Sequence, residues 1–144
     1  MMILCLLSAL GFFVEDPAVS IVLKDWSPEK GYRTEWRFSI DADAKEGKLE
    51  VVADAGETTG PKKAAFSREK LKTFLEKLEK TQAWTVKTNR CKCPHEGYGI
   101  TLKVGDKEHD YSVNWNRAKE QKKAYEEVFE LVTRFCEERL GEQK

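Results

Sequence analysis

The strict alternation of side chains between positions 32 and 40 constrains the fold more than any other feature of the sequence. One face of this segment is formed by every second residue: Tyr32, Thr34, Trp36, Phe38 and Ile40. The residues between them are charged or carry a hydroxyl group. Because successive side chains of a β-strand point to opposite faces, the pattern predicts a strand with one buried face and one solvent-exposed face.

Four further segments have the composition of β-strands. Residues 18–26 form a short run rich in β-branched side chains, and residues 49–53 resume the alternation after a polar connection. Residues 98–104 and 111–115 alternate on either side of the turn Gly105-Asp106. The sequence therefore predicts two antiparallel hairpins in addition to an early strand.

Two helices complete the predicted secondary structure. The polar, turn-rich residues 54–65 are interpreted as a connection, and Ser67 is the expected N-cap of a helix that ends near Thr81. The second helix is predicted from about Ala118 to Leu140. The fold class is thus α+β, with an antiparallel sheet of about five strands in the order βββ-α-ββ-α and two helices packed on one face.

The first 14 residues are apolar and uncharged, which predicts an export leader. This run is shorter than the roughly 20 residues of a membrane-spanning helix, so no stable membrane span is expected in the mature chain. We assign residues 1–20 to a signal peptide or apolar leader and 21–144 to a single α+β domain, with Ala9-Leu10-Gly11 and Ala18-Val19-Ser20 as candidate cleavage motifs. The expected location is secreted, periplasmic or envelope. A buried N-terminal strand or helix is the alternative.

The charge balance and the missing motifs exclude several classes of function. Lys and Arg total 25, Asp and Glu also total 25, and no basic stripe is visible, so nucleic acid is not an expected partner. The sequence contains no glycine-rich phosphate loop of the Walker or dinucleotide type. No nucleophile with a base and an orienting group stands out, which favours a non-catalytic domain over an enzyme.

The run Cys91-Lys92-Cys93-Pro94-His95 is the strongest local candidate for chemistry, and three interpretations of it remain open. Export favours a disulfide among Cys91, Cys93 and Cys136. Cys91, Cys93 and His95 could instead bind Zn²⁺ or copper, or support thiol redox chemistry, since thiolates and imidazole suit these metals. In the third interpretation the cysteines are thiols, and Cys136 is a small core residue of the last helix. No other cofactor is predicted.

The large aromatic residues of the predicted strands are assigned either to the core or to the surface. Trp36, Trp115 and Tyr98 lie on apolar strand faces and are interpreted as core residues. Trp26 falls near the end of the first strand, which makes it the candidate for an exposed contact residue.

The order of elements resembles that of small exported bacterial α+β domains of unknown function. The similarity rests on the leader, the early strand, the aromatic alternating strand, the helix start Ser67-Arg68-Glu69-Lys70-Leu71, the second hairpin and the closing helix. The layout is also distantly similar to emfourin-type protease inhibitors, which implies a binder of a secreted protease. We therefore expect an exported, non-catalytic domain that binds a protein or envelope partner; the alternative is a small metal-binding or thiol-redox module.

Overall fold

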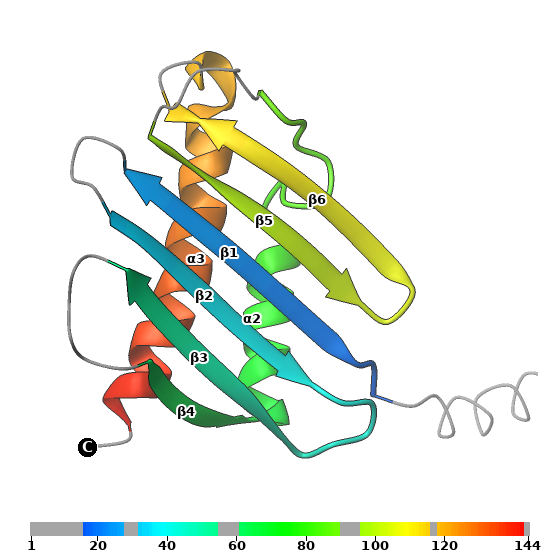
Figure 1. Ribbon diagram of the computed structural model, residues 1–144. Coiled ribbons are helices and arrows are strands. Elements are labelled where there is room, and N and C mark those ends of the chain that lie inside the picture. Colours follow the sequence, from blue (N-terminus) through cyan, green and yellow to red (C-terminus); the bar gives the residue numbers. More distant parts are fainter. Residues whose placement is uncertain (1–15, 28–31, 55–60, 90–95, 116–117, 143–144) are drawn as a thin grey trace, which may run out of the picture.

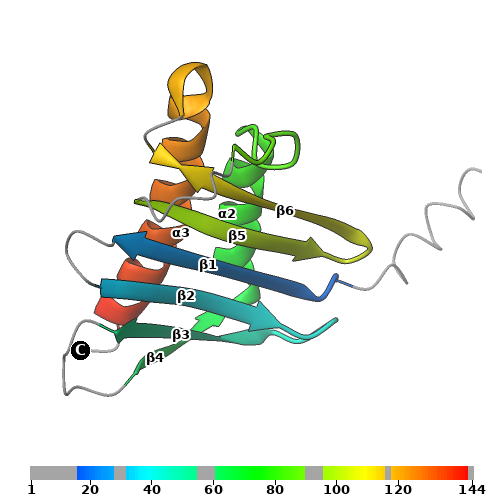
Figure 2. The same cartoon turned by 45° about the horizontal axis from the view of Figure 1, so that its top comes forward.

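A computed structural model describes residues 16–27, 32–54, 61–89, 96–115 and 118–142 of the chain. These residues form one six-stranded sheet and two α-helices. Every pair of neighbouring strands is antiparallel. Figures 1 and 2 show both helices packed against the same face of the sheet, so the molecule has two layers.

The strands lie in the order β4-β3-β2-β1-β5-β6, which places the first strand in the centre of the sheet. In chain order the elements are β1 (Val19–Ser27), β2 (Tyr32–Ile40), β3 (Glu46–Asp54), β4 (Lys62–Ser67), α2 (Arg68–Glu79), β5 (Gly97–Val104), β6 (Lys107–Asn114), the 3₁₀ turn η2 (Lys119–Gln121) and α3 (Lys122–Gly141).

The α+β class and the antiparallel sheet are confirmed, but the predicted strand count and order were wrong. The sheet has six strands, and the order is ββββ-α-ββ-α rather than βββ-α-ββ-α. The missed strand is β4, which lies within and just after the segment 54–65 that was interpreted as a connection. It is an edge strand with only Ala64 and Phe66 buried, and it begins with two lysines. Two inward residues are too few to produce a recognisable alternation.

Several local predictions are confirmed. The alternating segment 32–40 is β2 with unchanged limits. The Ser67 hydroxyl accepts a hydrogen bond from the backbone N–H of Lys70 at 3.2 Å and caps α2. Gly105 occupies the turn between β5 and β6 with a φ of 59°, a left-handed conformation that glycine adopts without a steric penalty.

The core lies between the sheet and the helices, and a group of phenylalanine rings joins the two layers. Phe38 of β2 contacts Phe74 of α2 and Phe135 of α3, with ring centroids 5.3 and 4.8 Å apart. Phe66 of β4 contacts Phe38 and Phe135 at 5.9 and 5.4 Å. Edge-on and tilted contacts of this kind add to the stabilisation that comes from burying the rings.

The folded domain includes part of the segment predicted as a leader. β1 begins at Val19, which is 2% exposed and pairs with Ile40 on one side and Val104 on the other. Residue 16 is also tied to the domain, because its backbone N–H donates to the Asp43 carboxylate at 2.8 Å. Within the described ranges, no helix combines the length and apolar character that a membrane crossing requires.

Candidate functional site

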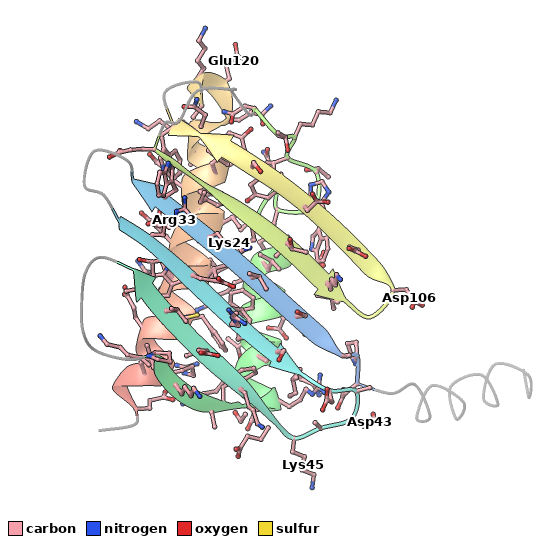
Figure 3. The ribbon with its side chains drawn as sticks, viewed as in Figure 1. Lys24, Arg33, Asp43, Lys45, Asp106 and Glu120 are labelled. Carbon is pink, nitrogen blue, oxygen red and sulfur yellow. The ribbon has the colours of Figure 1, made fainter. Side chains whose placement is uncertain are left out.

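The face of the sheet opposite the helices is the candidate functional site. Both helices lie on the other face, and no described element covers this one (Figures 1 and 2). Because successive side chains of a strand point to opposite faces, alternate residues of each strand belong to it. Lys24 of β1 and Arg33 of β2 belong to this open face, as Figure 3 shows. We use the term open face for this side of the sheet below.

The strand register places charges of opposite sign next to each other in the middle of the open face. One row crosses all six strands, each residue opposite the next: Lys63, Glu50, Arg37, Val22, Thr101 and Asp110. Opposite charges in directly opposed positions stabilise an antiparallel sheet by a few tenths of a kcal/mol to about 1 kcal/mol per pair. In the described part of the chain, however, Glu50 forms no ion pair with Lys63 or Arg37, and Arg37 pairs with Glu35 instead, so the contribution of this row to stability lies at the low end of that range.

The neighbouring row contains short side chains and produces a hollow. Ser20, Ser39 and Ala65 lie on three different strands; Ser20 is opposite Ser39, and Lys48 separates Ser39 from Ala65. A hollow of about 650 Å³ lies above them. We call it the cationic hollow, because its charged lining residues are Arg37, Lys48, Lys63 and Glu50, three cations and one carboxylate.

A second hollow of about 580 Å³ lies towards the other end of the same strands. We call it the tryptophan hollow, because Trp26 lines it together with Lys24, Arg33, Glu35 and Val52. The Arg33 guanidinium carbon lies 4.2 Å from the centre of the Trp26 ring, which is a cation–π contact. Trp26, the predicted contact residue, is therefore on the open face, where it is partly buried beneath this guanidinium.

An ion pair connects the two hollows. Arg37 lines the cationic hollow and Glu35 lines the tryptophan hollow, and the Arg37 Nη2 atom lies 2.9 Å from Glu35 Oε1. Lys48 and Lys63 are exposed, and neither takes part in an ion pair with any residue that the structure describes. These two ammonium groups are thus available to an incoming anion.

The predicted cysteine and histidine site divides between described and undescribed parts of the chain. Cys91, Cys93 and His95 lie outside the described residues, so their pairing and any metal or redox role stay predictions. Cys136 is a free thiol on α3 with 0% exposure. Burial is the main cause that raises its pKa to about 12, so it is a core thiol and not a nucleophile at neutral pH.

The other histidine has a structural role at the edge of the sheet. A ring nitrogen of His109 lies 2.8 Å from the carbonyl oxygen of Val86, which joins β6 to the segment after α2. The Asn89 side chain continues this edge contact, since it accepts from the N–H of Asn114 at 2.6 Å and donates to its carbonyl at 3.2 Å. In the described part of the chain, no group of three or more His, Cys, Asp or Glu side chains could hold a metal ion.

A cluster of tyrosine hydroxyl groups lies in the covered layer and is part of the core. The Tyr98 hydroxyl donates to the carbonyl of Tyr125 at 2.7 Å and lies 2.9 Å from the Tyr111 hydroxyl, which is therefore the donor in that second bond. Burial raises the pKa of Tyr98 and of Tyr111 above the usual value. These hydroxyls stay protonated and hold α3 on β5 and β6, in agreement with the prediction that Tyr98 is a core residue.

For the β2 residues of the open-face site, the sequence predicted only that they lie on the solvent-exposed face of a strand. Arg37 and Ser39 were placed there by alternation, but nothing in the sequence marked them as neighbours of Lys48 or Lys63. Lys63 was missed completely, because β4 was not predicted.

The comparisons with known proteins identify no relative of this chain. No family model matches the sequence, and no curated protein or solved structure is significantly similar to the chain. The case for a function therefore rests on the open face itself.

Proposed function

We propose that the chain is an exported, non-catalytic domain that binds a protein partner through the open face of its sheet. The observation that carries the proposal is the pair of hollows on a face that no described element covers. The twist of a sheet can curve one face, but the cationic hollow is also deepened by the short side chains of Ser20, Ser39 and Ala65. Two adjoining hollows of this size allow a partner surface to pack with shape complementarity.

The residue types at the tryptophan hollow support a protein partner. Tryptophan and arginine are enriched at the energetic centres of protein interfaces, because each combines a large contact area with a polar group. Trp26 and Arg33 are already stacked on each other at 4.2 Å. This contact fixes both side chains before binding, which lowers the entropy lost on association.

Inhibition of a secreted protease is the specific form of this function that the emfourin-like layout implies. An inhibitor of this kind would occupy the protease with a preformed surface, and the open face is rigid because it is part of a six-stranded sheet. Residual activity of secreted proteases, measured against increasing concentrations of the purified domain, tests this form. A stoichiometric loss of activity supports it, and unchanged activity of every protease contradicts it while leaving other protein partners open.

A matched pair of charge reversals tests the use of the open face. Arg33 lies over Trp26 on the open face, and Lys107 lies over Trp84 elsewhere on the surface; both cations are 4.2 Å from the ring centre. Partners are captured from envelope and secreted fractions, purified, and titrated with each variant. We expect Arg33→Glu to weaken binding about tenfold or more, which corresponds to 1.4 kcal/mol, while Lys107→Glu binds like the wild type. The reverse order of the two variants would contradict the proposal.

The metal-binding or thiol-redox module stays the second candidate, because Cys91, Cys93 and His95 lie within five consecutive residues of the sequence. Free-thiol counting and metal analysis of the purified protein test it. A bound metal or a redox-active thiol pair that is lost in Cys93→Ser would favour this candidate. Its retention in that variant would remove Cys93 from the site.

A further inference from the structure

The two hollows differ in charge, and this difference constrains what can bind to each. The charged residues that line the cationic hollow are three cations and one carboxylate, although the whole chain has equal numbers of acidic and basic residues. In the tryptophan hollow, the open-face charges are Lys24, Arg33 and Glu35; Asp25 also lines it, but it alternates with Lys24 and Trp26, so its side chain belongs to the covered face. The cationic hollow thus has three cations, whereas the tryptophan hollow has two cations and the apolar surface of Trp26 and Val52. A ligand that covers both hollows is therefore expected to be acidic at one end and apolar at the other.

The arrangement of the cationic hollow suits a carboxylate. Lys48 lies opposite Ala65, and Lys63 is two positions from Ala65 on the same strand, so the two lysines are diagonal neighbours. Side chains in that relation start about 7–8 Å apart, and both can reach a group placed between them. The short side chains of Ser20 and Ser39 leave room for that group and add two hydroxyl donors beside it.

The spacing of the hollows sets the length of the ligand. Ser20, in the row of short side chains, and Trp26 lie six positions apart on β1. At about 3.3 Å per residue, this separation is roughly 20 Å, which an extended chain of about six residues covers. Trp26 and Val52 offer an apolar contact at that end of the ligand.

From these features we infer that the open face receives an extended acidic segment of the partner protein. One carboxylate of the segment sits above Ser39 and Ala65, beside Lys48 and within reach of Lys63. An apolar side chain about six residues away contacts Trp26. The inference rests on the proposed function and specifies the chemistry of its partner. A lipid bilayer is a poorer fit, since a flat surface cannot reach short side chains at the bottom of a hollow.

Synthetic peptides and NMR test this inference without knowledge of the natural partner. The probe is the octapeptide Glu-Glu-Glu-Ser-Ser-Ser-Leu-Leu, with terminal charges blocked. Matched peptides carry Gln or Lys in place of Glu, or Ser in place of Leu. Backbone amide signals of the ¹⁵N-labelled protein report where each peptide binds. We expect the acidic peptide to shift the signals of β1 to β4 on the open face, and the Gln and Lys peptides to bind at least about tenfold more weakly.

Charge reversal identifies the residues responsible. We expect Lys48→Glu/Lys63→Glu to weaken binding of the acidic peptide about tenfold or more. Lys77→Glu/Lys123→Glu makes the same change in net charge on exposed positions of α2 and α3, and we expect it to bind nearly as the wild type does. Equal weakening by both variants would show a general charge effect and overturn the inference. So would signal shifts confined to the helices.

Further outcomes separate this inference from the proposed function. If the captured partner depends on Arg33 but the acidic peptides do not bind, the inference is wrong and the proposed function stands. If phosphatidylglycerol vesicles or an RNA oligonucleotide bind at Lys48 and Lys63 while the peptides do not, the protein segment is the wrong occupant. If the peptides bind the open face but no protein partner depends on Arg33, the proposed function loses its support and the anion site remains.

Discussion

Arg68 should be one of the most important polar residues for the stability of this domain. It is the first residue of α2 and is only 7% exposed. Its guanidinium donates three hydrogen bonds to backbone carbonyls: Nε to Ala44 at 2.9 Å, Nη1 to Pro17 at 2.6 Å and Nη2 to Asp41 at 2.6 Å. One side chain thereby joins the start of β1, the turn between β2 and β3, and the start of α2.

The magnitude of its contribution follows from these three bonds. Net values of roughly 1.5–3 kcal/mol for a hydrogen bond to a charged group would sum to about 4.5–9 kcal/mol over the three bonds. Two terms reduce that sum. Burying the guanidinium costs solvation free energy, and the carbonyls of Pro17 and Asp41, which belong to exposed residues, can bind water in its absence. We therefore expect Arg68→Met, which keeps the aliphatic volume, to lower the free energy of unfolding by about 3 kcal/mol.

Urea denaturation followed by circular dichroism measures this loss, and two further variants make the result specific. Arg68→Lys keeps the charge, but one ammonium group cannot match a planar fork of donors, so we expect about half of the loss. Lys70→Met removes an exposed ion pair with Glu142 from the same turn, and we expect less than about 1 kcal/mol. A value for Arg68→Met within 0.5 kcal/mol of the wild type, or a Lys variant as stable as the wild type, would refute the reasoning.

Three other predictions test the N-terminal boundary, the sheet and the core thiol. A chain that begins at Asp16 should melt at the temperature of the full chain, whereas one that begins at Ile21 lacks the start of the central strand and should melt well below it. Gly97→Ala should destabilise the domain by roughly 1–3 kcal/mol in urea, because the new Cβ would lie 1.9 Å from a carbonyl oxygen of β6; Gly99→Ala, with 3.6 Å to the nearest atom, is the control and should be near neutral. Cys136 should react with a thiol reagent at pH 8 only as the protein unfolds, and fast labelling of the folded protein would contradict its burial.

The sequence predicted the strands whose inward positions are long and apolar. β2 was found with correct limits because five consecutive alternate positions carry consistent side chains. β4 was missed because an edge strand has one neighbour, and its lysines are typical of both a loop and a protected edge. Its membership of the sheet depends on pairing with β3 and on Phe66 reaching the phenylalanine group, which are contacts that no local pattern shows.

The open-face site could not be predicted for a related reason. Alternation assigns a residue to a face, but it does not identify the neighbouring strand or the register. Lys48 and Lys63 become neighbours because β3 pairs with β4, and the floor of the hollow forms because Ser20 meets Ser39 across β1 and β2. The position of β1 between β2 and β5 is a property of the whole topology.

The short side chains of the open face are the feature that the proposed binding function explains and that stability alone does not. Serine and alanine are poorer strand residues than threonine, valine or aromatic residues, so Ser20, Ser39 and Ala65 give up cross-strand contacts that larger side chains would make. The adjacent row shows that the same face accommodates larger residues, since Val22 and Thr101 lie there. No described helix or strand covers the open face (Figure 2), so packing against another element does not require Ser20, Ser39 and Ala65 to be small. The proposed partner segment would require small residues at these three positions, because larger side chains would fill the cationic hollow.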